Sequence, residues 1–278
     1  MAKKFLITGG AGFIGSNFIR FILDKYPDCN VTNLDKITYA GNLDNLKDIN
    51  NNKNYTFVKG DVCDLKLVNN LIQDMDIVVH FAAETHVDRS IIDAGVFVKT
   101  DVFGTFSLLS AAKNNRIEKF IHISTDEVYG SIYKSFANEE SPLMPTNPYS
   151  ASKAGADRLA YSYFAAFKVP VIIARSSNNF GPYQHVEKLI PLFVTNSVEN
   201  KKLPLYGDGL NMRDWLYVMD NCEAIDFLMN NGVEGNVYNV GANNEKTNIE
   251  IAQAILKEID KPNSLIEFVK DRASHDRR

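Results

Sequence analysis

The chain has 278 residues and a formal net charge of -4 at pH 7. This length allows one large α/β domain or two unequal lobes, and the acidic balance offers no basic surface for nucleic-acid phosphates. Three cysteines, Cys29, Cys63 and Cys222, lie far apart without a CxxC pair, so neither a disulfide framework nor a zinc cluster is expected. Because no signal-peptide pattern and no long apolar run occur, we expect a cytoplasmic protein that binds neither nucleic acid nor membrane.

Short apolar segments alternate with longer amphipathic segments along the first part of the chain. The short segments are rich in β-branched and aromatic residues and lack polar alternation, which predicts strands that are buried on both faces. These predicted strands are residues 4–8, 31–34, 55–58, 77–81, 119–124 and 169–174. The longer segments 13–26, 93–114 and 149–167 are predicted crossover helices. The alternation predicts an α/β fold with a Rossmann-type, doubly wound parallel sheet.

A glycine-rich turn lies between the first predicted strand and helix. Gly9, Gly12 and Gly15 form GxxGxxG, which lets backbone amides approach a pyrophosphate at a helix N-terminus. Asp35 ends the second strand, where a carboxylate can accept hydrogen bonds from an adenosine ribose and repel a 2′-phosphate. The pattern predicts NAD as the cofactor in preference to NADP, although the adjacent Lys36 would partly offset the repulsion.

A second motif combines Tyr149 and Lys153, which form YxxxK on a predicted helix, with Ser124 and Thr125 at a strand end. Four residues span about one helical turn, so both side chains share a face, where the ammonium group would lower the pKa of the tyrosine. Such a tyrosine can remove an alcohol proton while hydride leaves for nicotinamide. A surface Tyr and Lys would explain YxxxK alone, but its coincidence with GxxGxxG indicates a redox site.

After Arg175 the rhythm loosens, and proline and glycine separate shorter elements. We predict an NAD-binding Rossmann domain over residues 1–175 and a smaller, interleaved substrate lobe mainly over residues 176–278.

The segment 125–130, Thr-Asp-Glu-Val-Tyr-Gly, follows the fifth predicted strand. Together with the two motifs above, it resembles the dTDP-glucose 4,6-dehydratase family of the extended short-chain dehydrogenase/reductase superfamily. Related epimerases and decarboxylases usually lack the Asp-Glu pair. The similarity extends over nearly the whole chain, through segments 34–42, 81–90, 175–184, 187–191 and 206–218. Relatives continue beyond Arg278, so the substrate lobe is expected to lack the family's C-terminal end.

The resemblance implies conversion of dTDP-glucose, or a related NDP-hexose, to a 4-keto-6-deoxy sugar and water. Oxidation at C4 makes the C5 proton acidic, water leaves across C5–C6, and the hydride returns to C6. The resemblance assigns Asp126 as the acid for the C6 hydroxyl and Glu127 as the base for C5, beside the catalytic Thr125, Tyr149 and Lys153. Burial and mutual repulsion can separate the pKa values of neighbouring carboxyl groups, although such a pair could also serve as a helix cap and a salt bridge.

The resemblance and the motifs together imply the binding residues. Residues expected to bind NAD are Gly9, Gly12, Phe13, Ile14, Gly15, Asp35, Lys36, Thr38, Gly41, Asp61, Val62, Ala82, Ala83, Thr100, Tyr149, Lys153 and Asn178. Residues expected to bind the nucleotide sugar are Thr85, Thr125, Asp126, Glu127, Asn179, Lys188, Leu189, Pro204, Tyr206, Arg213, Asn248, His275 and Asp276. Arg213 is the best physical candidate for the diphosphate, because a guanidinium binds phosphate bidentately.

Further single positions carry weaker expectations. Glu84 and Tyr129 match family positions that contact the glucosyl unit or nicotinamide, and Asp101 stands where the family usually has Asn. His80 and His122 lie on apolar strands and are expected to be hydrogen-bonded core residues. No metal site is expected, because the histidines show no ligand spacing.

Two alternatives remain open for the activity. A UDP-sugar 4-epimerase or decarboxylase would use the same cofactor and tyrosine but would not need Asp126 and Glu127. A non-catalytic NAD-sensing module would need only the glycine turn and Asp35.

The helices 93–114 and 149–167 carry more apolar side chains than one sheet face readily covers, including Val96, Val98, Leu108 and Leu109. They predict a homodimer with a four-helix interface, as the resemblance also implies.

Overall fold

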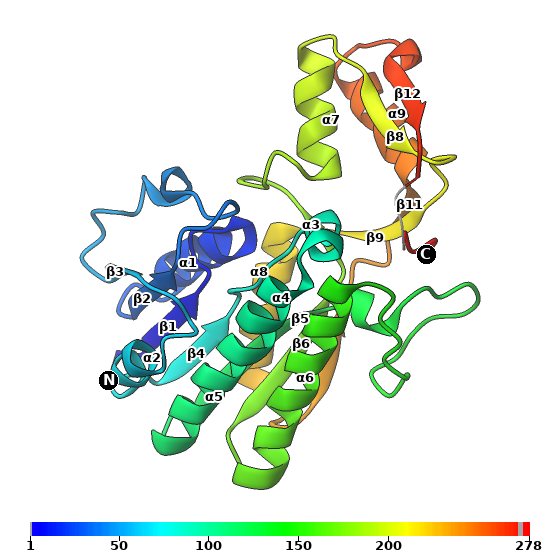
Figure 1. The fold of residues 1–278 in the computed structure, drawn as a ribbon. Coiled ribbons are helices and arrows are strands. Elements are labelled where there is room, and N and C mark those ends of the chain that lie inside the picture. Colours follow the sequence, from blue (N-terminus) through cyan, green and yellow to red (C-terminus); the bar gives the residue numbers. More distant parts are fainter. Residues whose placement is uncertain (1, 272–274) are drawn as a thin grey trace.

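The computed structural model describes residues 2–271 and 275–278, and its centre is a parallel sheet (Figure 1). The strand order is β10-β6-β5-β4-β1-β2-β3, so the order reverses beside β1 as in doubly wound folds. The strands are β1 (Lys4–Thr8), β2 (Asn30–Asp35), β3 (Tyr55–Lys59), β4 (Ile77–His80), β5 (Lys119–Thr125), β6 (Val171–Ser176) and β10 (Val237–Val240). The predicted doubly wound sheet is confirmed, and each predicted strand lies within two residues of its observed bounds.

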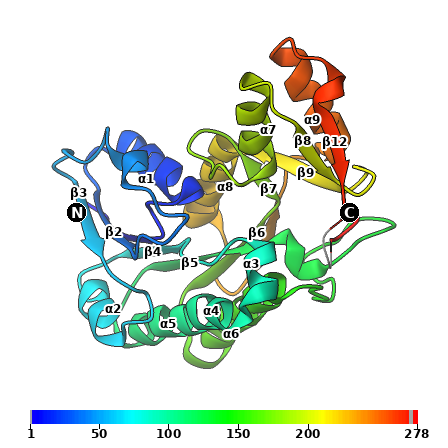
Figure 2. The same ribbon diagram turned by 45° about the horizontal axis from the view of Figure 1, so that its top comes forward.

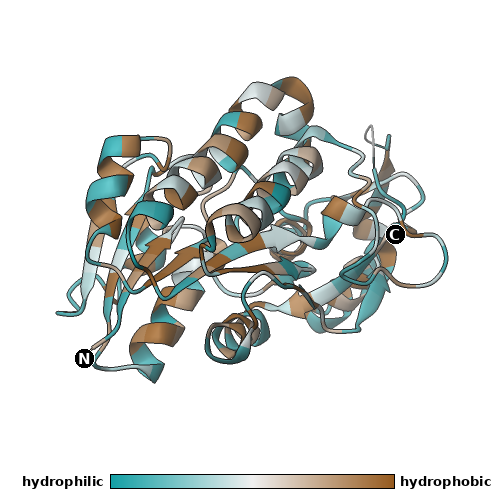
Figure 3. Cartoon of the chain, turned by 90° about the horizontal axis from the view of Figure 1, so that it is seen from below, coloured by the Kyte–Doolittle hydropathy of each residue, from teal (hydrophilic) through white to brown (hydrophobic). Residues whose placement is uncertain are grey.

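Helices cover both faces of this sheet (Figure 2). One face carries α1 (Phe13–Lys25) and α8 (Val218–Asn231), and the other carries α2 (Leu65–Ile72), α5 (Gly104–Asn114) and α6 (Pro148–Phe167). Hydrophobic residues gather along the central strands (Figure 3), since helices exclude water from both faces. The sheet is therefore a rigid platform whose strand ends can hold functional groups in fixed positions.

The predicted helix 93–114 is continuous but contains a π-helical segment. It begins with α4 (Ala94–Phe97), passes through the π-helical segment Val98–Phe103 and continues as α5. A π-helical segment shifts the helix face by part of a turn and often marks a functional site. Here it contains Asp101, which is buried. Leu108 and Leu109 are fully buried in the core, so these two side chains belong to the part of the apolar content that the sheet covers.

A smaller unit stands above one end of the sheet in Figure 1. Its helices and strands are α7 (Leu189–Val198), β8 (Leu203–Tyr206), α9 (Asn248–Glu258) and β12 (Ile266–Val269). It has its own small core, in which Phe193 packs with Leu203, Leu205, Ala252 and Leu256. The chain returns from this unit to the large sheet through α8 and β10, so the residues after 175 serve both units.

Shorter elements connect the two units. A three-stranded sheet is formed by β7 (Asn178–Phe180), β9 (Met212–Tyr217) and β11 (Glu245–Thr247). The remaining short helices are η1 (Leu43–Leu46), α3 (Val87–Ile92), η3 (Asp126–Tyr129) and η4 (Asn263–Leu265). Within residues 2–271 and 275–278, no helix is both long and apolar enough to span a bilayer.

Candidate active site

The main cavity opens at the carboxyl ends of the parallel strands and extends to α7 of the smaller unit. Its volume of about 490 Å³ is within the range of small-molecule sites. All of the residues expected to bind NAD line this cavity, as do Glu84 and all of the residues expected to bind the sugar except Asp276. The structure therefore brings together side chains from both units at the place where open α/β sheets bind ligands.

The glycine turn forms one wall of the cavity. Gly9 has φ +73°, in the left-handed region that favours glycine, and a Cβ atom on Gly15 would lie 2.4 Å from the Gly9 carbonyl oxygen. Gly12 caps α1 without a side-chain hydrogen bond, so first-turn amides of the helix remain available to a ligand. This glycine cradle fits a pyrophosphate held by backbone N–H groups and the helix dipole.

Asp35 is held rigidly beside the turn. Its carboxylate accepts hydrogen bonds from Ala11 N at 2.9 Å and Ile37 N at 2.8 Å, and burial raises its pKa. The neighbouring Lys36 forms an ion pair with Asp61, with 2.7 Å between Nζ and Oδ2. Because Asp61 balances the charge of Lys36, this lysine offsets the repulsion of a 2′-phosphate less than its position in the sequence suggests. The wall fits NAD better than NADP.

The carboxyl pair lies where β5 ends and η3 begins. Thr125 caps this short helix, since its Oγ1 accepts a hydrogen bond from Glu127 N at 3.2 Å. Burial raises the pKa of Asp126 to about 7, with a further increase from the neighbouring Glu127 and a smaller opposing effect from Arg213. Asp126 can therefore keep its proton near neutral pH and act as an acid, as expected for one member of the pair.

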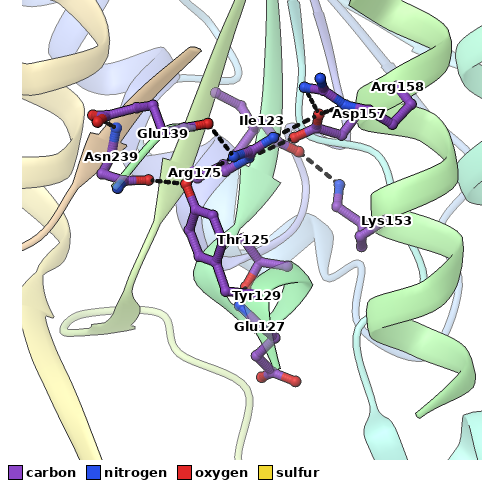
Figure 4. A network of polar contacts seen from close by, with 10 residues as sticks. All are labelled: Ile123, Thr125, Glu127, Tyr129, Glu139, Lys153, Asp157, Arg158, Arg175 and Asn239. Carbon is purple, nitrogen blue, oxygen red and sulfur yellow. Dashed lines mark hydrogen bonds and ion pairs between the residues drawn. The ribbon is translucent and has the colours of Figure 1, made fainter. Parts of the chain in front are cut away.

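Tyr149 and Lys153 lie in the first turns of α6. A capping box between Asn147 and Ser150 fixes the start of this helix. Lys153 Nζ donates a hydrogen bond to the Ile123 carbonyl oxygen at 2.6 Å (Figure 4). Burial raises the pKa of Tyr149 well above its usual value, and the nearby carboxyl groups raise it further. Burial and the negative charge of these carboxyl groups therefore outweigh any lowering of this pKa by Lys153.

A buried network connects η3 to α6 (Figure 4). The Arg175 guanidinium donates to both carboxylate oxygens of Asp157, at 2.8 and 3.0 Å, and to the Tyr129 hydroxyl at 2.7 Å. Tyr129 in turn donates to Asn239 Oδ1 at 2.7 Å. Tyr129 therefore turns away from the cavity, and the expectation that it contacts the sugar or nicotinamide is not met. Its hydroxyl instead links η3 to β6 and β10.

Two further expectations need correction. Asp276 accepts hydrogen bonds from Ser131 and Thr146 and does not line the cavity, because it holds the end of the chain against the loop after η3. His80 is hydrogen-bonded as expected, to Thr8 at 2.7 Å and to Thr105 at 3.0 Å. Neither ring nitrogen of His122 has a partner among the described residues, and burial lowers its pKa well below 6.5, so this histidine is neutral.

Several residues that line the cavity were not predicted from the sequence. Ser176 ends β6, Ser177 follows it, and both line the cavity; their position at a strand end is a signal that could have identified them. Leu192 and Phe193 reach the cavity from α7, where only the packing of the smaller unit decides which face points inward. Among the described residues, no cluster of His, Cys, Asp and Glu could hold a metal ion.

Comparisons with known proteins agree with this geometry. The family model for GDP-mannose 4,6 dehydratase matches residues 6–278. The chain is 52% identical to the low-salt glycan biosynthesis protein Agl12 of Haloferax volcanii, over 98% of this chain and 88% of that protein. It is 48% identical to a dTDP-glucose 4,6-dehydratase of Streptomyces niveus, over 98% of this chain and 82% of that protein.

A solved structure extends the comparison to three dimensions. The crystal structure of the dTDP-glucose 4,6-dehydratase from Streptomyces venezuelae with NAD bound matches with a TM-score of 0.96 at 46% identity, covering 99% of this chain and 87% of that chain. The chain therefore belongs to the nucleotide-sugar dehydratase family that the matching family model describes, together with the dTDP-glucose 4,6-dehydratases.

Proposed function

We propose that the protein is an NAD-dependent hydro-lyase that converts dTDP-glucose to dTDP-4-keto-6-deoxyglucose and water. The observation that carries this proposal is the meeting of Asp126 and Glu127 with Tyr149 and Lys153 in one cavity. Oxidation of an alcohol needs only the tyrosine and lysine, whereas elimination of water also needs a base and an acid. Relatives named dTDP-glucose 4,6-dehydratase at 44–48% identity support dTDP-glucose as the substrate.

The residues of the chain have distinct tasks in this reaction. The glycine turn, Asp35 and the neighbouring strand ends would hold NAD, which would supply the acceptor for the hydride from C4 and the donor of that hydride to C6. Tyr149 removes the proton of the C4 hydroxyl, and the Lys153 ammonium stabilises the phenolate that takes part. The C4 carbonyl acidifies C5, so Glu127 can remove the C5 proton while Asp126 protonates the departing C6 hydroxyl. When the hydride returns to C6, Glu127 gives its proton back to C5, so the products are the keto sugar and one water molecule.

The smaller unit and the connecting strand β9 supply side chains for the nucleotide diphosphate. Arg213 of β9, Asn248 of α9 and Tyr206 at the end of β8 line the cavity on this side. Arg213 is the chief phosphate-binding group, because its guanidinium can donate two parallel hydrogen bonds. Lys188 also lines the cavity, and its ammonium group donates to the Thr85 carbonyl oxygen at 2.9 Å.

The experiment is incubation of the purified protein with a panel of NDP-hexoses. Formation of a 4-keto-6-deoxy product, detected by its alkali-induced absorbance, with dTDP-glucose as the best substrate supports the proposal. Formation of a C4 epimer or a decarboxylated sugar instead would assign the protein to the competing class. No turnover, with NAD retained, would favour the sensing module.

We further propose that the protein is a homodimer in the cytoplasm. Apolar side chains are exposed on α3, on the π-helical segment and on α6. Ile92 is 86% exposed, Val98 is 55% exposed and Phe167 is 47% exposed. Such a stripe on neighbouring helices suits a self-complementary helical interface. Light scattering at micromolar concentration is expected to give twice the chain mass, and Val98→Glu is expected to lower it; a monomeric wild-type protein would contradict the proposal.

A further inference from the structure

Asp101 is a buried acid beside α6, the helix that carries Tyr149 and Lys153. The Asp101 side chain does not line the cavity. It is 1% exposed and lies in the π-helical segment Val98–Phe103. Its Oδ1 accepts a hydrogen bond from Glu84 N at 2.9 Å, and its Oδ2 accepts one from the Ser152 hydroxyl at 2.6 Å. Ser152 precedes Lys153 on α6, and its hydroxyl also lies 2.8 Å from the Tyr149 carbonyl oxygen. Asp101 therefore connects the loop after β4 to the helix of the redox pair.

These hydrogen bonds do not require an acid. Both donors are neutral, so an asparagine could accept from Glu84 N through Oδ1 and donate to Ser152 Oγ through Nδ2. The Ser152 hydroxyl would then donate to the Tyr149 carbonyl oxygen, which is already within reach. An ionised carboxyl at this depth is costly, because burial raises the pKa of Asp101 to about 6. The negative charge therefore needs an explanation other than hydrogen bonding.

The negative charge of Asp101 acts on the ammonium group of Lys153. This lysine is 6% exposed, and burial lowers its pKa, whereas Asp101 and Asp157 raise it. Asp157 already forms ion pairs with Arg175 and Arg158 (Figure 4). Asp101 accepts its two side-chain hydrogen bonds from neutral groups, so its charge is the less compensated of the two. The ammonium form of Lys153 depends chiefly on Asp101 for balance.

The other titratable groups around the redox pair come from η3, from β4 and the loop after it, and from β5. Glu127 and Asp126 of η3 face Tyr149 and raise its pKa, as Asp101 also does. Glu84, in the loop after β4, raises the pKa of Asp101. Burial lowers the pKa of His80 in β4 and of His122 in β5 well below 6.5, and the positive charge of Lys153 lowers both further. Both histidines are therefore neutral.

We propose that Asp101 is a positioning residue that acts on the redox pair through its negative charge, stabilising the Lys153 ammonium ion and opposing ionisation of Tyr149. This inference rests on the proposed function, in which Tyr149 and Lys153 carry out the oxidation. With an acid at position 101, both groups hold their protons to higher pH than they would beside an amide. The pH range of the oxidation step is therefore shifted toward alkaline solution by this side chain.

The test compares two matched variants. Asp101→Asn removes the charge and keeps the hydrogen bonds, whereas Ser152→Ala removes a hydrogen bond and keeps the charge. The substrate is dTDP-6-deoxyglucose, which has a C4 hydroxyl to oxidise but no C6 hydroxyl to lose, so Asp126 and Glu127 are not required. The single-turnover rate of reduced nicotinamide formation is measured against pH.

The rate should rise with pH as Tyr149 loses its proton and fall as Lys153 loses its proton. We expect Asp101→Asn to move both the rising and the falling limb of this profile toward acid by about one pH unit, which is the lower end of the effect of a neighbouring charge. Ser152→Ala is expected to lower the rate without moving the limbs. Unmoved limbs in Asp101→Asn, or equal movement in both variants, would overturn the inference and leave Asp101 a structural residue.

A second measurement needs no substrate and so separates this inference from the proposed function. Asp101 has a higher pKa in the folded protein, about 6, than the usual 3.8, so its contribution to stability is full below about 3.8 and is lost as the pH rises through 6. The Tm of the wild-type protein should therefore fall relative to Asp101→Asn between about pH 4 and pH 6.5, and the difference should be constant at higher pH. A difference in Tm between the two proteins that does not change with pH would mean that Asp101 does not become charged in the folded protein over this range, and would overturn the inference. Failure of the wild-type protein to oxidise the sugar would contradict the proposed function alone.

Discussion

The two walls of the cavity are built from different materials. The cofactor wall, which we propose binds NAD, consists of the glycine turn and the ends of adjacent strands in one sheet, and its glycines present backbone alone. The sugar wall, which we propose binds the nucleotide sugar, includes side chains from α7, β8 and α9 of the smaller unit, which has its own core, and from β9, which connects the two units. Backbone recognition tolerates almost no added volume, whereas side-chain recognition can be weakened step by step. Substitutions on the cofactor wall should therefore abolish NAD binding and turnover. Substitutions on the sugar wall should weaken substrate binding to different degrees.

The largest effect is expected for Gly15→Val on the cofactor wall. A Cβ atom on Gly15 would lie 2.4 Å from the Gly9 carbonyl oxygen and 2.8 Å from Gly10 Cα, so the turn must open. We expect loss of bound NAD and of all turnover, measured by release of nucleotide on denaturation. Gly155→Ala is the matched control, since its added Cβ would be 3.4 Å from the nearest atom, Val102 Cγ2, and this variant should keep NAD. Retention of NAD by Gly15→Val would mean that the turn is not the pyrophosphate site.

The next largest effect is expected at the redox pair between the walls. Tyr149→Phe removes the hydroxyl that begins the oxidation, so the rates of C4 oxidation and of product formation should both fall by ~10²-fold or more. Bound NAD should be retained, because the glycine turn and Asp35 remain intact. A variant that oxidises the sugar at the wild-type rate would exclude Tyr149 as the base.

The carboxyl pair should separate the later steps from the first. Asp126→Asn should still permit oxidation at C4 but should form product slowly, by about 10²-fold, because the C6 hydroxyl lacks its acid. Glu127→Gln should also suppress exchange of the C5 hydrogen with deuterated solvent. Fluoride leaves without a proton, so a 6-fluoro substrate should rescue Asp126→Asn more than Glu127→Gln. Equal rescue of both variants would return the pair to a structural role.

A smaller and graded effect is expected on the sugar wall. Arg213→Ala should raise KM about tenfold or more, since a hydrogen bond to a charged group contributes roughly 1.5–3 kcal/mol, and Arg213→Lys should recover part of it. Arg213 also lowers the pKa of Asp126. Its removal should raise that pKa above about 7, and because Asp126 must be protonated to act, the alkaline fall in activity should move to higher pH. An unchanged KM in Arg213→Ala would remove this residue from the phosphate site.

The same contrast between walls explains what the sequence could predict. The glycine turn and the strand ends depend on neighbouring residues, so their positions follow from local spacing and burial. Tyr129 depends on distant partners, since its hydroxyl binds Arg175 and Asn239, and no local pattern reveals that it turns inward. Asp276 is likewise held by Ser131 and Thr146. Residues whose orientation is set by long-range contacts were the ones predicted wrongly.

The most direct test of the account follows one hydrogen atom. The sugar dTDP-glucose carrying deuterium at C4 is incubated with the enzyme in ordinary water, and the product is analysed by NMR and mass spectrometry. If C4 oxidation, elimination and hydride return occur in one active site, the deuterium should appear at C6 of a 4-keto-6-deoxy product. Deuterium that stays at C4, in a recovered or epimerised sugar, or that is lost to solvent while product forms, would contradict the proposed reaction.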